Sequence, residues 1–386
     1  MRLERRTTTP PWLRVVVPIG ALAVALVLVA IILGASGHNP LSTYRAMFRA
    51  GFTDRGALSA TLLNATPLVL TGLCAVVTFR MRIYNIGGEG QLYVGAVAAT
   101  AVGLALGGRP SGLVIVAMIA AGMAGGALWA GIPGVLRAYV NTNEILTSLM
   151  LNYVAGLLIL YLIFDSTSYW RNLTSPGAKV YPQGKMLTSR GWWPAWHLGG
   201  LAIPLGFVLG AGLAVGVTLA LQYTRTGFQM RLVAGSPAAG RYAGIDTRRL
   251  ILVVMLLSGA LAGLAGASQV GDFSHLLDPN GLEQAMYGYA GIVGAALAGF
   301  EPLAVIVTAV FLGALTNAAV QLEGPSFPDG LVGTIEGTIL FCVVSGALMT
   351  TYRVHRRASD PGPPEAPAEA ITSPVETSLV DSRAQS

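Results

Sequence analysis

Long apolar stretches, separated by shorter polar loops, dominate the pattern along this chain. A helix needs about 20 apolar residues to cross a hydrocarbon core of about 30 Å. Lipid cannot satisfy open backbone groups, so spanning segments must be helical. The pattern therefore predicts an all-α polytopic membrane protein with about ten transmembrane helices, at residues 15–35, 57–79, 86–107, 111–134, 145–164, 200–221, 250–269, 285–300, 302–321 and 330–352.

Composition agrees with this prediction, because 53% of the residues are hydrophobic and only 11% are charged, against about 25% charged in a soluble domain. The net charge of +6 does not indicate nucleic acid binding, since the arginines lie in loops between the apolar stretches. With the N-terminus inside, most of them fall in inside loops, as the positive-inside rule requires. Both termini are therefore predicted to be cytoplasmic. The first apolar run is longer than a signal-peptide core, which favours an uncleaved first span.

The polar segments divide the chain into a short cytoplasmic segment at 1–14, a transmembrane domain at 15–352 and a tail at 353–386. The tail is rich in Pro, Ala, Ser and Glu and is expected to be disordered and cytoplasmic. A loop at 165–199 is predicted to be external. Its tryptophans indicate either an aromatic belt at the headgroups or a docking surface for an external partner.

An offset of five helices reverses the direction of crossing, so the second to fifth and the seventh to tenth spans are arranged as an inverted repeat would be. Small residues recur at four-residue spacing in two of these spans. Such positions let helix backbones approach closely, which predicts tight packing at Gly122, Gly126, Gly259, Gly263 and Ala267.

Polar residues gather where the third span begins, in the segment Tyr84–Gln91 with its three glycines. In one interpretation Asn85 is an N-cap and the helix dipole favours Glu89. In the other, a broken helix lines a translocation path. An amide inside the fifth span must bond a neighbouring helix or face a wet cavity. The candidate pathway residues are Asn85, Glu89, Gln91, Asn152 and Tyr153; Asn64, Gln269, Asn317 and Glu336 are further polar positions within spans.

The arginine-rich loop 222–249 contains the start and stop signals of a short helix. Ser236 is an N-cap candidate, Pro237 suits the first helical position, and Gly244 suits the position after the end. Two interpretations stay open: an interfacial helix attracted to anionic lipid, or a lever that inserts into a cytoplasmic motor protein.

These segments resemble a known family. Residues 85–91 and 143–153 resemble signatures of the nucleoside-type permeases of bacterial ABC importers, within the wider group for simple sugars and branched-chain amino acids. Residues 235–245 are similar to the coupling helix of that group, and 288–292 fit a looser block. The resemblance covers about 56–349. The chain departs from the family at Ser236, where Asn is usual, and at Gly240, where Ala or Arg is frequent.

The resemblance implies a permease domain at 15–352 in the bacterial plasma membrane, paired with a second permease that is identical or different. An extracytoplasmic binding protein would deliver a nucleoside or related solute. Cytoplasmic ATPase subunits would bind ATP and Mg²⁺, since this chain has no P-loop motif, no cofactor and no enzymatic activity of its own. The implied coupling residues are Ser236, Pro237, Ala238, Ala239, Arg241, Tyr242 and Gly244.

An alternative is an ion- or proton-driven secondary transporter of a small polar solute. Such a transporter needs acids deep in the spans, and only Glu89 and Glu336 come near. A membrane-embedded enzyme is a weaker alternative, because the spans contain no histidine, acid pair or metal-ligand spacing. Cys74 and Cys342 are isolated and indicate neither a disulfide framework nor a metal site.

Overall fold

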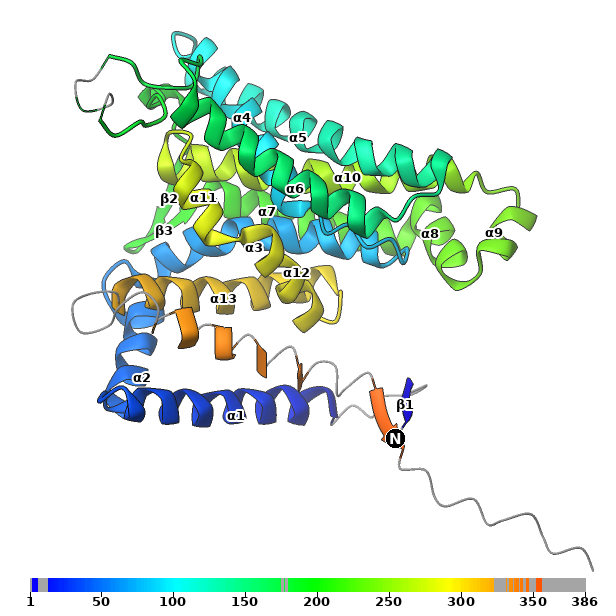
Figure 1. The fold of residues 1–386 in the computed structure, drawn as a ribbon, viewed down its shortest axis with the longest axis horizontal. Coiled ribbons are helices and arrows are strands. Elements are labelled where there is room, and N and C mark those ends of the chain that lie inside the picture. Colours follow the sequence, from blue (N-terminus) through cyan, green and yellow to red (C-terminus); the bar gives the residue numbers. More distant parts are fainter. Residues whose placement is uncertain are drawn as a thin grey trace, which may run out of the picture.

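The computed structural model describes residues 2–5, 13–174, 177, 180–322 and 352–355, together with helical positions between 331 and 346. Within this part of the chain, six helices are long and apolar enough to cross a membrane (Figure 1). Three of them continue into π-helical turns. They are α3 (Ala57–Phe79), α5 (Ser111–Val135) with η2 (Leu136–Val140), α6 (Glu144–Leu160) with η3 (Tyr161–Asp165), α7 (Leu205–Tyr223), α10 (Thr247–Ser268) with η6 (Gln269–Ser274), and α13 (Pro302–Leu322).

The other helices flank, connect or interrupt these spans. They are α1 (Leu13–Ala35), α2 (Pro40–Phe48), η1 (Arg49–Thr53), α4 (Gly88–Ala105), η5 (Ser189–Gly191), α8 (Arg225–Gly235), α9 (Pro237–Tyr242), α11 (Pro279–Ala285) and α12 (Tyr287–Leu297). Two short antiparallel pairs complete the described part: β2 (Ala195–Leu198) with β3 (Leu201–Pro204), and β1 (Arg2–Arg5) with β4 (Tyr352–His355).

The helical polytopic fold is found, and six of the ten predicted spans correspond to the six helices that are long and apolar enough to cross a membrane. The count of ten stays a prediction, and two of the predicted spans differ from the helices of the structure. The predicted span at 200–221 starts only at Leu205, because β3 occupies its first residues and ends at Pro204. The predicted span at 285–300 is shorter in the structure, where α12 covers Tyr287–Leu297. Met286, whose φ of 45° is left-handed, separates α12 from α11, which lies before the predicted span.

The C-terminal predictions are only partly within the described residues. The span at 330–352 is described at single positions, and Glu336 lies outside the described residues, as does the predicted tail beyond His355. Arg353 to His355 belong to β4 rather than to a disordered tail.

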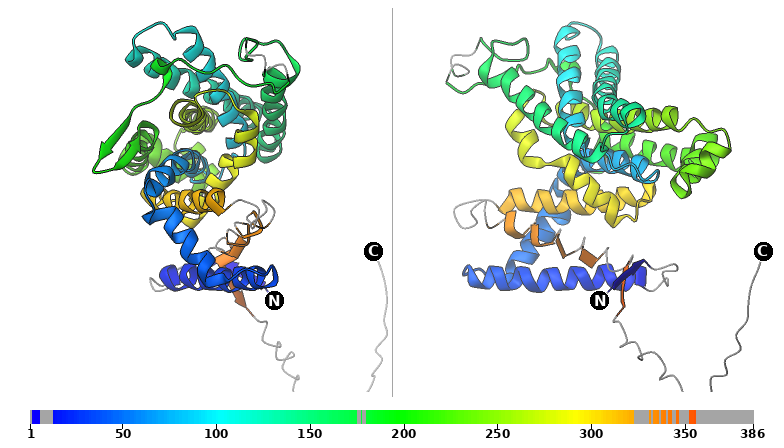
Figure 2. Two further views of the ribbon diagram at one scale, coloured as in Figure 1. Left: turned by 90° about the vertical axis from the view of Figure 1, so that its left-hand side faces the viewer. Right: turned by 45° about the vertical axis from the view of Figure 1, so that its right-hand side comes forward.

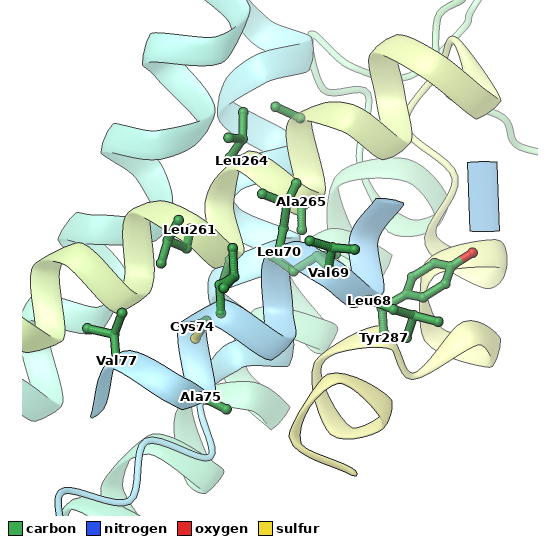
Figure 3. Close-up of a cluster of buried hydrophobic side chains, with 14 of the residues drawn as sticks. Leu68, Val69, Leu70, Cys74, Ala75, Val77, Leu261, Leu264, Ala265 and Tyr287 are labelled. Carbon is green, nitrogen blue, oxygen red and sulfur yellow. The ribbon is translucent and has the colours of Figure 1, made fainter. Parts of the chain in front are cut away.

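Helices α3 and α10 form the centre of the bundle. Helix α3 packs against α12 and α13 on one side, whereas α10 packs against α4 and α5 on the other, and the two central helices also touch (Figure 2). Residues on every face of α3 are buried, as expected for a helix that is apolar all round. Figure 3 shows this core, where Leu70 and Cys74 of α3 lie close to Leu261 and Leu264 of α10.

Close approach of α5 and α10 confirms the packing predicted from the small residues. A Cβ added at Gly126 would lie 2.6 Å from the Cα of Gly263, and one at Gly122 would lie 2.6 Å from the Cβ of Ala267. Only glycine permits this backbone separation. The contact fixes α10, which in turn positions the polar segment that precedes α4.

Candidate functional site

The segment before α4 is held by a buried pair of amide side chains. Asn85 Nδ2 donates to Ser258 Oγ of α10 at 2.9 Å and to Gln91 Oε1 at 3.1 Å, and Gln91 Nε2 donates back to Asn85 Oδ1 at 2.9 Å. The Asn85 Oδ1 also accepts the Gly87 N–H at 3.0 Å. Both side chains are about 1% exposed. The pair therefore anchors the start of α4 to α10.

The N-cap interpretation of Asn85 was wrong in its position, because the residue that caps α4 is Gly87, without a side-chain bond. Asn85 lies two residues earlier and bonds Gly87 in an Asx-type turn. The sequence pattern did not distinguish these geometries, since both use an amide followed by glycines.

Asn152 joins three helices. On α6, its Oδ1 accepts the Gly90 N–H of α4 at 2.9 Å, while its Nδ2 donates to Ile86 O at 2.9 Å and to the Tyr289 hydroxyl of α12 at 3.0 Å. The expectation that this amide needs a partner on a neighbouring helix is met by these bonds. One side chain thus satisfies backbone groups that the broken start of α4 leaves open.

Glu89 lies where the first turns of α4 and α12 meet. Its Oε2 accepts the Gly288 N–H at 2.5 Å, and the carboxylate is only 3% exposed. Its Oε1 has no partner in hydrogen-bond geometry among the described residues, although the Tyr93 side chain lies beside it. The positive ends of two helix dipoles converge on this carboxylate, which favours its negative charge.

A cavity of about 350 Å³ opens beside Glu89, between α4, α6, α11 and α12. Two carboxylates, one amide and three tyrosines supply its polar surface. It is lined by Glu89, Tyr93, Asn152, Tyr153, Gly156, Leu157, Leu160, Glu283, Met286 and Tyr289. Carboxylates accept hydrogen bonds from hydroxyl and N–H groups, and tyrosine rings offer flat apolar faces. The arrangement can bind a small uncharged solute with hydroxyl groups and a planar or ring part.

Of the five candidate pathway residues, three line this cavity: Glu89, Asn152 and Tyr153. Asn85 and Gln91 lie in the amide pair instead, so a pathway role for them stays a prediction. Asn317 is also elsewhere, because its Nδ2 donates to Ala50 O at 2.8 Å and holds η1. Asn64 and Gln269 are not among the lining residues either.

Sequence reasoning missed several cavity residues. Tyr93 lies one turn after Glu89 on α4, a spacing that places both on one face, so a signal was present. Tyr289 lay inside the looser block of the resemblance. Nothing in the pattern indicated Glu283 or Met286, because α11 lies before the predicted span at 285–300 and was not predicted as a helix.

The predicted short helix in the arginine-rich loop is confirmed as α9. Ser236 is its N-cap, with Oγ accepting the Ala239 N–H at 3.2 Å, and Pro237 is its first residue. Gly244 has the left-handed φ of 71° expected after a helix end. The Tyr242 side chain is 98% exposed, so the helix presents an aromatic group to a potential partner.

The departure at Gly240 has a packing reason. A Cβ at this position would lie 2.8 Å from Val233 Cγ2, so the absence of a side chain lets α9 pack directly on α8. In Figure 1, α8 and α9 project from one end of the bundle, and the β2–β3 hairpin lies at the other end. This arrangement agrees with the prediction that loops 222–249 and 165–199 lie on opposite sides of the membrane.

The tryptophans of loop 165–199 attach it to the helix ends. Trp170 Nε1 donates to Val97 O at 3.0 Å, and the backbone N–H of Trp193 donates to Gly271 O at 3.0 Å. The Trp192 ring stacks on His275, with centroids 4.3 Å apart and planes 11° apart. Trp196, in contrast, is 48% exposed on β2. These residues therefore brace the loop, and the hairpin keeps an exposed aromatic surface.

Comparison with known proteins supports the resemblance. The family profile described as branched-chain amino acid transport system / permease component matches residues 57–351. The chain is 31% identical to the glucose ABC transporter permease protein TsgB13 of Haloferax volcanii, over 96% of this chain and 97% of that protein.

Two bacterial relatives cover most of the chain as well. The guanosine ABC transporter permease protein NupP of Bacillus subtilis is 31% identical over 85% of this chain and 92% of its own length. The nucleoside ABC transporter permease protein NupB of Lactococcus lactis is 28% identical over 86% and 90%. The chain belongs to the family of branched-chain amino acid transport system permease components.

Proposed function

We propose that this chain is the permease subunit of an ABC importer and forms the pathway for a nucleoside or a related sugar-containing solute across a bacterial plasma membrane. The observation that carries this proposal is the similarity, over most of the chain, to permeases that are named for glucose, guanosine and nucleosides. Glucose and nucleosides share a polyhydroxylated ring, which is the chemical class we assign to the solute.

The cavity beside Glu89 supports this class of solute. Hydroxyl groups of a sugar can donate to the Glu89 and Glu283 carboxylates, while a base or the apolar face of a ring can lie on Tyr153 or Tyr289. No cation lines this cavity among the described residues, so an uncharged solute suits it better than an anionic one. We expect a weakly attractive path, with much of the selectivity in the binding protein.

The packing supports an inverted repeat. Helix α3, the second span, contacts α12 and α13, and helix α10, the seventh span, contacts α4 and α5. If α3 is matched to α10, the two neighbours of α3 therefore correspond to the two neighbours of α10. Under this match α4 corresponds to α12, and the first turns of these two helices meet at Glu89 and Gly288. Transporters with such repeats place their solute site where the repeats meet, at broken helices.

The energy for transport would come from separate ATPase subunits that bind ATP and Mg²⁺. We propose that Ser236, Pro237, Ala238, Ala239, Arg241, Tyr242 and Gly244 form the element that inserts into them. A helix capped by Ser236 and packed on α8 moves as a unit, whereas a flexible loop would absorb the displacement. Motion of α9 can then shift packed helices between two arrangements.

Co-purification tests this proposal. An affinity-tagged chain from its native cells should retain an ATPase and a second permease, and uptake of labelled guanosine or glucose should stop when ATP is depleted. Tyr242→Asp should weaken ATPase retention, while Tyr181→Asp, at another exposed tyrosine in the loop at the other end, should not. Uptake that survives ATP depletion, with no ATPase retained, would favour the ion-driven alternative.

A further inference from the structure

A second, larger cleft lies at the end of the bundle that bears α9. Its volume is about 840 Å³, and residues that lie far apart in the sequence line it. Its charged lining is mainly arginine: Arg82 follows α3, Arg137 belongs to η2, Arg241 to α9 and Arg248 to the first turn of α10. Four arginines from separate segments of the chain therefore line one concave surface.

These charges are largely uncompensated. Asp246 is the one acid among the described lining residues, and its Oδ1 already accepts the N–H groups of Arg248 and Arg249, at 3.0 and 3.1 Å, as the N-cap of α10. Arg137 pairs with Glu144 at 3.3 Å. Arg82 and Arg241 form no ion pair within the described part of the chain.

One further observation, at the start of α10, supports an anion as the ligand of this cleft. Thr247 is one of the lining residues, and its Oγ1 is buried without a hydrogen-bond partner among the described residues. The hydroxyl lies at the N-terminus of the 22-residue α10, where the helix dipole favours negative charge.

From these features we propose that the cleft binds a phosphate group, carried either by an anionic phospholipid or by a soluble phosphate compound. Guanidinium groups bind phosphate oxygens through paired hydrogen bonds, and the Thr247 hydroxyl supplies one more donor. The binding itself does not depend on the proposed function. The consequence of binding does depend on the proposed function. A bound phosphate would join Arg241 of α9 to Arg82 and Arg137 at the helix ends, and would hold the coupling helix against the bundle.

The test uses the purified full-length chain without any ATPase. In one arm, the chain is placed in phosphatidylcholine nanodiscs with or without phosphatidylglycerol, and retained lipid is counted by native mass spectrometry. In the other arm, inorganic pyrophosphate and AMP are titrated against the chain in detergent, with the unfolding midpoint as readout. A signal in the first arm identifies a lipid, and a signal in the second identifies a soluble phosphate.

The double variant Arg82→Gln, Arg241→Gln should weaken the positive arm by about tenfold or more, since hydrogen bonds to charged groups are strong. Thr247→Val, which keeps the shape, should weaken it by a few-fold. Arg225→Gln removes one charge at the same end of the bundle but outside the cleft, and should bind as wild type does. The absence of a signal in both arms, or equal binding by wild type and the double variant, overturns the proposal.

Discussion

The contact between α5 and α10 offers a sharp test of the structure. In Gly126→Ala, the new Cβ would lie 2.6 Å from the Gly263 Cα and 2.7 Å from the Gly263 N. Carbon atoms in contact need about 3.5–4.0 Å, so the helices must separate by about 1 Å. The Gly259 carbonyl oxygen lies nearer still, and all three obstacles are backbone atoms, which cannot rotate away as a side chain can.

Overpacking a well-packed core typically costs about 1–3 kcal/mol, and we expect the upper end of this range because no side chain can yield. The matched control is Gly216→Ala in the middle of α7, where an added Cβ meets nothing within 4 Å. That change should be neutral or should stabilise by up to about 1 kcal/mol, since alanine is the better helix former.

The assay is thermal unfolding of the purified chain in one detergent, followed by tryptophan fluorescence. Gly126→Ala should lower the unfolding midpoint by several degrees, and Gly216→Ala should leave it unchanged or raise it. If both variants have the same unfolding midpoint as wild type, α5 and α10 do not approach closely at Gly126. The helix packing that positions the segment before α4 is then incorrect.

Three further changes test the site and its coupling. Asn152→Leu removes the hydrogen-bond partners of Gly90 N and Ile86 O. Each buried backbone group left unpaired costs about 1–3 kcal/mol, so both the unfolding midpoint and solute uptake should fall. Normal uptake would argue against a role of Asn152 in joining these helices. Ser236→Ala removes the cap of α9, at a cost of about 1 kcal/mol, and should lower solute-stimulated ATP hydrolysis by the complex, whereas Ser236→Asn should retain it; equal activity of the two variants would contradict the capping argument. Burial lowers the pKa of His275 below its usual 6.5, so the folded state favours the neutral ring and loses stability as pH falls below about 6.5; His275→Phe keeps the stack on Trp192 and should remove this dependence, as unfolding midpoints at pH 7.5 and 5.5 would show.

The sequence predicted the spans well where they are long and uninterrupted. The bounds of α3 match the prediction at both ends, because its apolar run is complete and each end is polar. Prediction failed where local backbone geometry breaks an apolar run. The left-handed turn at Met286 and the hairpin before Leu205 lie within stretches that are apolar enough to be read as continuous helix.

The candidate site was only partly predictable for a different reason. Glu89 and Asn152 could be singled out, since polar groups within a span are costly. Whether such a group faces a cavity or a neighbouring helix depends on contacts between distant segments. Asn85 and Glu89 belong to one motif, yet Asn85 bonds Ser258 of α10 while Glu89 meets Gly288 of α12, and no local pattern encodes that choice.

The most direct test of the central claim asks what α9 touches. In the variant Tyr242→Cys, the new cysteine carries a photo-crosslinker in native membranes, while the native Cys74 and Cys342 are both buried. Val180→Cys, in the loop at the other end and 82% exposed, is the matched control. The account predicts that Tyr242→Cys crosslinks to a nucleotide-binding subunit and resists impermeant thiol reagents in intact cells, while Val180→Cys is labelled from outside. Labelling of Tyr242→Cys from outside, or the absence of any such crosslink, would contradict it.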